Sequence, residues 1–177
     1  MHPCSHATLS DWEPQKEFFV GLDSDGCVLD TMDLKHKQTF APLFVKHYGL
    51  YEVGDRAREA WSFVALYSRH RGLNRFRALV KALDLLEQYV EDHRIEIELP
   101  DARAVEAWLM QEPHPSSETL RRFISEGSHP ILPQTLEWSL AADRAIARMP
   151  RAVAFPGVVQ CLTQIREKAD TMVVSTA

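Results

Sequence analysis

The sequence has 177 residues, of which 45% are hydrophobic and 25% are charged, as in a globular protein with one sizeable core. Its formal net charge of -5 does not favour binding to nucleic acid, so we expect no nucleic-acid partner. The sequence contains no run of about 18 apolar residues, the length that a membrane-spanning helix needs, and its first residues lack the apolar segment of a secretory signal. We therefore expect a cytoplasmic protein with no membrane partner.

Two short apolar runs predict strands that are buried on both faces of a parallel sheet. The first is 18–22, and the second is 172–174, directly before Ser175 and Thr176. Between Gly157 and the second run, apolar residues recur at helical spacing, which predicts a helix before that strand.

The long region between the two runs has no convincing strand and several helical patterns. Punctuating Gly, Pro, Ser and Asn residues divide it into predicted helices at about 33–48, 57–68, 74–92, 104–110 and 116–127, and a further one from 133. Pro42 is expected to kink the first of them. Because two parallel strands do not form a stable sheet by themselves, we expect the chain to be the N-terminal portion of a larger fold.

Two carboxylates follow the first predicted strand. Asp23 and Asp25 are one residue apart, so the period of two along a strand would direct them to the same side. At an effective dielectric constant of about 20 their repulsion would cost about 2 to 4 kcal/mol unless a proton or a cation intervenes. Mg²⁺ prefers one or two carboxylates, and ligands of open α/β sheets bind beyond the carboxyl ends of the strands, where Ser175 would also lie.

Other interpretations of this segment remain. It can be an ordinary turn at the end of a strand with solvated acidic side chains. A calcium-binding EF-hand loop does not fit, because its sixth and twelfth positions, counted from Asp23, would be Val28 and Leu34 instead of Gly and Glu.

Segment 18–31, Phe-Phe-Val-Gly-Leu-Asp-Ser-Asp-Gly-Cys-Val-Leu-Asp-Thr, resembles the first motif of the haloacid dehalogenase (HAD) superfamily, with Cys27 in place of the usual Thr or Val. Segment 171–176 resembles the second motif, and 155–158, Phe-Pro-Gly-Val, is similar to a sequence often found before it. The resemblance implies an α/β fold: a HAD-like Rossmannoid parallel-sheet core, incomplete here, formed by 15–32 and 151–177. An all-helical cap domain, 33–150, would be inserted into it.

The resemblance also implies a chemistry. Asp23 would be the nucleophile that forms an aspartyl-phosphate, and Asp25 the acid and base. The Asp23 carboxylate and the main-chain carbonyl of Asp25 would bind Mg²⁺, while Ser175 and Thr176 would bind the phosphoryl group. The expected function is therefore a Mg²⁺-dependent phosphatase acting on a small phosphorylated substrate.

The sequence departs from the family pattern because the Lys and the acidic pair of the later motifs are not present. We therefore expect these 177 residues alone to bind Mg²⁺ poorly and to have little activity. Two alternatives stay open: cleavage of a phosphonate or carbon–halogen bond by the same superfamily, or a non-enzymatic helical binding module in which the two acids are incidental.

An arginine-rich segment, 67–77, lies between two predicted helices. Arginine forms bidentate contacts with oxyanions, so Arg71, Asn74 and Arg75 are candidates for recognition of an anionic substrate. The alternative is a solvated basic loop.

Overall fold

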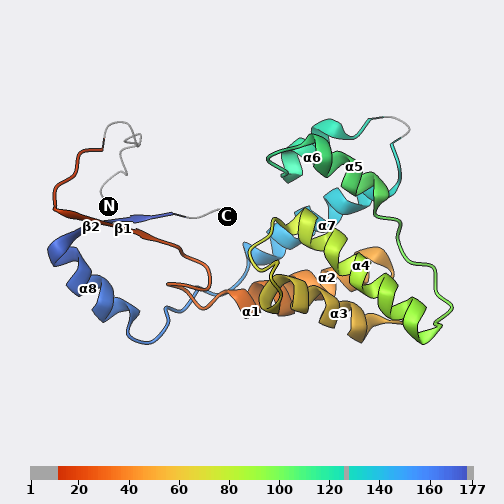
Figure 1. Cartoon of the computed structure of the whole chain (residues 1–177), viewed down its shortest axis with the longest axis horizontal. Coiled ribbons are helices and arrows are strands. Elements are labelled where there is room, and N and C mark those ends of the chain that lie inside the picture. The colour runs from red at the N-terminus through yellow and green to blue at the C-terminus, as the bar shows by residue number, and fades with distance from the viewer. Residues whose placement is uncertain (1–11, 126–127, 175–177) are drawn as a thin grey trace. The chain divides into compact units, whose positions relative to one another are not determined.

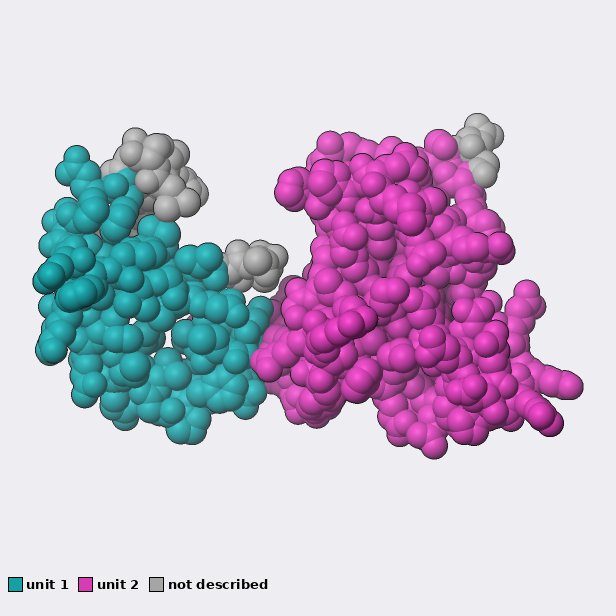
Figure 2. All heavy atoms as spheres, in the orientation of Figure 1, with its two compact units in different colours: residues 1–31, 152–177 teal, residues 32–151 magenta. Residues whose placement is uncertain are grey.

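The computed structural model describes residues 12–125 and 128–174. The chain divides into two compact units, one formed by residues 1–31 and 152–177 and the other by residues 32–151 (Figure 2). Within the described ranges, none of the helices is both long and apolar enough to cross a membrane.

The described residues of the first unit form a two-stranded parallel sheet and one helix (Figure 1). β1 (Phe18–Leu22) pairs with β2 (Ala169–Val173), in a register that places Phe18 opposite Ala169 and Leu22 opposite Val173. Helix α8 (Val158–Lys168) precedes β2. Both apolar runs therefore contribute to strands, but β2 begins at Ala169 instead of Met172 and ends at Val173 instead of Val174.

The expected Rossmannoid α/β core is wrong for the described part of the chain. That part is predominantly helical, and its sheet consists of β1 and β2. Phe18 and Phe19, expected to be buried, are 59% and 51% exposed. The physical reason is that two strands and one helix have too little apolar surface to cover both faces of a parallel sheet.

The second unit is helical. It contains two π-helical turns, η2 and η3, within a series of α-helices: α1 (Met32–Lys35), η2 (His36–Phe40), α2 (Ala41–Tyr48), α3 (Gly54–Ser62), η3 (Phe63–Tyr67), α4 (Arg75–His93), α5 (Arg103–Gln111), α6 (Ser117–Phe123) and α7 (Ile131–Ile146).

Local sequence explains most of the helix ends. The side chain of Asn74 accepts a hydrogen bond from the N–H of Phe76 and caps α4, and Ser116 begins α6 with a capping box. Gly49 ends α2 with a φ of 67°, a conformation that favours glycine. The helix expected to reach Gly127 ends earlier, because Ile124 adopts an extended conformation.

The interruption expected at Pro42 takes the form of a π-helical turn just before it. The N–H of Ala41 donates to the carbonyl of His36, five residues back. Pro42 has no N–H, so it cannot continue the usual helical hydrogen bonds of the preceding turn.

Aromatic side chains form the centre of the second unit. Trp61 and Trp138 are fully buried and meet edge to face, with ring centroids 5.3 Å apart. Phe40 stacks on Trp61 at 5.4 Å, and Phe76 meets Trp108 edge to face at 5.1 Å. Large rings bury much apolar area per residue and prefer such geometries, so they hold α2, α3, α4, α5 and α7 around one core.

One buried hydrogen bond joins α2 to α7 inside this core. The hydroxyl groups of Tyr48 and Thr135 lie 2.8 Å apart. Both residues are buried, so each hydroxyl depends on the other for a partner.

We expect Tyr48→Phe to lower the free energy of unfolding by about 1 to 3 kcal/mol, because the Thr135 hydroxyl stays buried without this partner. In Tyr48→Phe/Thr135→Val both polar groups are gone, so the loss should be smaller than the sum of the two single losses. Urea unfolding followed by the fluorescence of the buried tryptophans measures this. Strictly additive losses would contradict the pairing.

Burial raises the pKa of Tyr48 well above its ordinary value, and the hydrogen bond to Thr135 offsets only part of that effect. Above pH about 10 the unfolded chain releases this proton while the folded chain retains it. The free energy of unfolding should therefore fall by about 1.4 kcal/mol per pH unit from this group alone. Comparing urea unfolding of the wild type and Tyr48→Phe between about pH 9 and 11 isolates the effect, because other groups cancel. Parallel curves would disprove it.

Candidate functional site

The candidate site lies where β1 ends. The pairing of Leu22 with Val173 is followed by a hydrogen bond of 2.8 Å from the N–H of Val174 to the carbonyl of Leu22. Because the strands are parallel, their carboxyl ends lie at the same edge of the sheet. Asp23 follows β1 at this edge, and its side chain is exposed. Ser175 and Thr176, the predicted phosphate-binding residues, lie outside the described residues.

A tight turn follows Asp23. The N–H of Leu29 donates to the carbonyl of Ser24, and the N–H of Gly26 donates to the carbonyl of Leu29, both at 2.8 Å. Gly26 has a φ of 73°, a conformation that residues other than glycine rarely adopt. The side chains of β1 alternate between the two faces of the sheet, but this alternation ends before Asp25. The expectation that strand alternation directs Asp23 and Asp25 to the same side is therefore wrong.

Further hydrogen bonds fix the far side of this turn. The N–H of Asp30 donates to the carbonyl of Val153 at 2.8 Å, and the N–H of Phe155 donates to the carbonyl of Val28 at 3.1 Å. The segment before α8 thus holds the turn from the side, which limits the conformations available to the two carboxylates.

Thr31 orients the second carboxylate. Its hydroxyl donates a hydrogen bond of 2.6 Å to Oδ1 of Asp25, and the residue is buried. Asp25 itself is half-buried. Sequence reasoning included Thr31 in the matched motif but gave it no role, because only the folded turn brings its hydroxyl to Asp25.

The oxygen ligands at this site fit Mg²⁺ in kind. A hard cation takes carboxylate and carbonyl oxygens and keeps several water molecules, so Asp23 and the main chain of Asp25 are suitable as part of its ligand set. Among the described residues no group of three or more His, Cys, Asp or Glu side chains is placed to hold a metal ion.

The arginine-rich segment folds into an ordered loop between η3 and α4. The Ser68 hydroxyl donates to the carbonyl of Val64 and accepts from the N–H of His70, both at 2.9 Å. Gly72 has a φ of 85°. The side chain of Arg71 is exposed and forms no hydrogen bond or ion pair with the rest of the described chain.

The other two candidates of this segment are engaged within the helical unit. Asn74 caps α4 and also donates from Nδ2 to the carbonyl of Pro115 at 2.8 Å. Arg75 forms an ion pair with Asp143, donates to Ser139 and lies over the ring of Phe40 at 5.1 Å. These contacts occupy both side chains, whereas the guanidinium of Arg71 is exposed and has no partner among the described residues.

No family model matches the chain, and no curated protein or solved structure was found to resemble it.

The two arginines should differ in their effect on stability. Arg75→Ala removes an ion pair, two hydrogen bonds to Ser139 and the contact with Phe40, so the free energy of unfolding should fall by about 1 to 2 kcal/mol. Arg71→Ala is the matched control and should change it by less than about 0.5 kcal/mol. Urea unfolding measures both, and equal losses would show that Arg75 contributes no more than an exposed side chain.

Proposed function

We propose that the protein is a Mg²⁺-dependent hydrolase of phosphate monoesters in which Asp23 is the nucleophile and Asp25 the acid and base. The observation that carries the proposal is the turn after β1. It presents one exposed carboxylate, Asp23, and holds a second, Asp25, by the hydrogen bond from Thr31. The sequence resemblance to the HAD superfamily supports the same assignment.

The first step transfers the phosphoryl group to the protein. A carboxylate oxygen of Asp23 attacks phosphorus, and the bond between phosphorus and the ester oxygen breaks. Asp25 donates a proton to the leaving oxygen, which departs as an alcohol. The exposure of Asp23 supports this role, because a nucleophile has to reach the substrate without a change in the fold.

The second step releases phosphate. Water attacks the phosphorus of the aspartyl-phosphate, Asp25 accepts the proton of that water, and the carboxylate of Asp23 is restored. Thr31 would act as a positioning residue that keeps Asp25 in one orientation through both steps. Mg²⁺, when bound, would supply positive charge against the charge of the phosphate.

The phosphate would be held beyond the end of β2. Ser175 and the main-chain N–H of Thr176 are the proposed donors, and the parallel pairing that continues to Val174 supports their approach to Asp23.

The restrained Asp25 favours phosphate esters over carbon–halogen bonds. A halide leaves without a proton, whereas an alkoxide leaves more easily when an acid protonates it. An acid fixed next to the nucleophile therefore assists cleavage of a phosphate ester but not of a carbon–halogen bond. Cleavage of a phosphonate, or simple binding without catalysis, remains an outcome that the following experiment distinguishes.

In the full-length protein we expect Asp23→Asn to lower kcat for p-nitrophenyl phosphate by about a thousandfold or more, because the amide cannot form the intermediate. Asp30→Asn removes an exposed carboxylate from the same turn and is the matched control, which should retain activity. Hydrolysis should require Mg²⁺ and stop when the metal is chelated. Equal rates for Asp23→Asn and the wild type would refute the assignment and favour a binding module.

Thr31 provides a second measurement on the same proposal. Thr31→Val should lower kcat by about tenfold and displace the pH profile, whereas Thr31→Ser, which keeps the hydroxyl, should restore both. An unchanged profile in Thr31→Val would show that the hydrogen bond to Asp25 serves the fold alone.

A further inference from the structure

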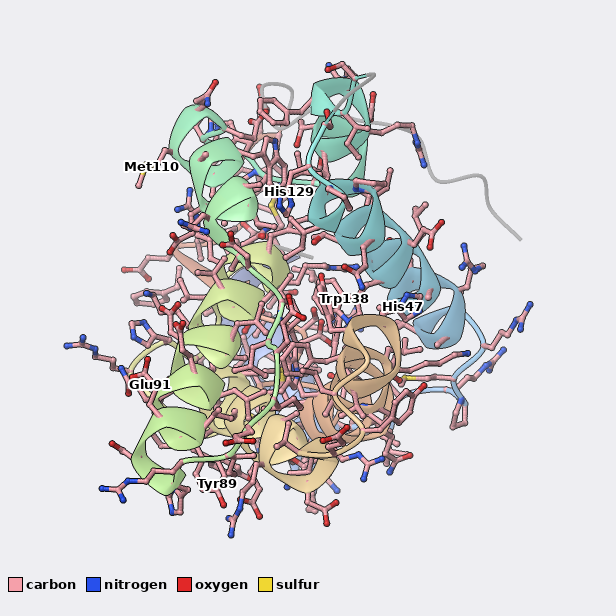
Figure 3. All side chains as sticks on the ribbon, turned by 90° about the vertical axis from the view of Figure 1, so that its right-hand side faces the viewer. His47, Tyr89, Glu91, Met110, His129 and Trp138 are labelled. Carbon is pink, nitrogen blue, oxygen red and sulfur yellow. The ribbon has the colours of Figure 1, made fainter. Side chains whose placement is uncertain are left out.

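Residues 94–100, Arg-Ile-Glu-Ile-Glu-Leu-Pro, follow α4 and lead towards α5 without forming a helix or a strand. Arg94 ends α4 with a φ of 52°, and the N–H of Ile95 donates back to the carbonyl of Val90. Figure 3 shows the segment on the outside of the helical unit, where it runs beside α4 from the end of that helix to the start of α5.

The side chains of the segment alternate between two faces. Ile95, Ile97 and Leu99 are half-buried and pack against the core, whereas Glu96 and Glu98 are exposed. This is the pattern of a strand with one covered face and one solvated face.

The main chain of this segment has no neighbouring strand. The N–H of Ile97 donates to the carbonyl of Ile95 in a three-residue turn. The N–H groups of Glu96, Glu98 and Leu99, and the carbonyl groups of 96–99, have no partner in the part of the chain that the structure describes. Beyond that turn, these free donors and acceptors can pair with a further strand.

The surroundings of the segment are mainly acidic, although Arg77 and Arg94 are also outside any ion pair among the described residues. The acidic side chains of the segment and its neighbouring helices that take part in no ion pair among the described residues are Glu87, Glu91, Asp92, Glu96, Glu98 and Glu106. Two others, Asp84 and Asp101, are paired with Lys81 and Arg103. A hollow of about 420 Å³, lined by Glu87, Leu99 and Glu106 among others, lies at the end of the segment towards α5.

We propose that residues 95–99 are a docking site for an extended, basic peptide of a partner protein, which pairs with this segment as a β-strand. Main-chain hydrogen bonds would supply the pairing, and lysine or arginine side chains opposite Glu96 and Glu98 would supply the preference for this partner.

The charges also decide against a second copy of this chain as the occupant. A copy that paired through the same segment would bring its own Glu96 and Glu98 against these carboxylates, and like charges across a strand pair repel. A basic peptide relieves this repulsion and is also attracted by the acidic residues around the segment.

The test uses a fluorescent peptide in which lysine alternates with valine, and measures anisotropy against the full chain at low salt. A peptide with glutamate in place of lysine reports the role of charge. A peptide methylated on the main-chain nitrogen of alternate residues reports strand pairing. We expect the lysine peptide to bind about tenfold or more tightly than the glutamate peptide, and methylation to weaken it about fivefold or more.

The variant Glu96→Lys/Glu98→Lys should reverse the preference between the two peptides. Glu137→Lys/Glu167→Lys makes the same charge change at exposed positions on α7 and α8 and is the matched control, which should keep the preference. Thermal unfolding and circular dichroism verify that both variants fold.

Four results would overturn the proposal. If the lysine peptide does not bind, residues 95–99 are not a docking site. Equal weakening in both double variants would indicate general charge attraction, and an unaffected methylated peptide would exclude strand pairing. Sedimentation that detects a dimer of the chain, abolished by Glu96→Lys/Glu98→Lys, would assign the segment to a second copy.

Discussion

The parallel pairing of β1 with β2 is the constraint on which the candidate site depends. It places the carboxyl ends of both strands at one edge of the sheet, and it is maintained by main-chain hydrogen bonds. The turn after Asp23 then adds what the sheet cannot supply, a fixed orientation for Asp25. The geometry of this edge thus depends on main-chain pairing and on side-chain contacts such as the hydrogen bond from Thr31 to Asp25.

The sequence predicted the elements that depend on local rules. The strand at 18–22, the cap at Asn74 and the helix that carries Pro133 in its first turn follow from apolar spacing and capping chemistry. It did not predict how far the strands are buried, because burial depends on what else packs against them. Segment 94–100 was missed as well, although its alternating Ile, Glu and Leu residues were a visible signal.

For the candidate site too, the sequence predicted the local features and not those that depend on the folded turn. Asp23 and Asp25 could be selected from their position after an apolar run, whereas the hydroxyl of Thr31 reaches Asp25 only once the turn has formed. The arginine-rich segment illustrates the limit. Composition alone cannot distinguish Arg71, which is exposed, from Arg75, whose partners lie on a helix more than sixty residues away in the chain.

The order in which the elements are synthesised gives the β1–β2 pairing a further consequence. Phe18 leaves the ribosome long before Ala169, its partner in the sheet, and the whole helical unit is made between them. The helical unit has its own aromatic core, so it can fold before β2 has been synthesised and has paired with β1. Once the helical unit has folded, β1 and β2 are joined through a compact body and no longer through a long flexible loop. The loss of chain entropy on pairing of the two strands is therefore smaller.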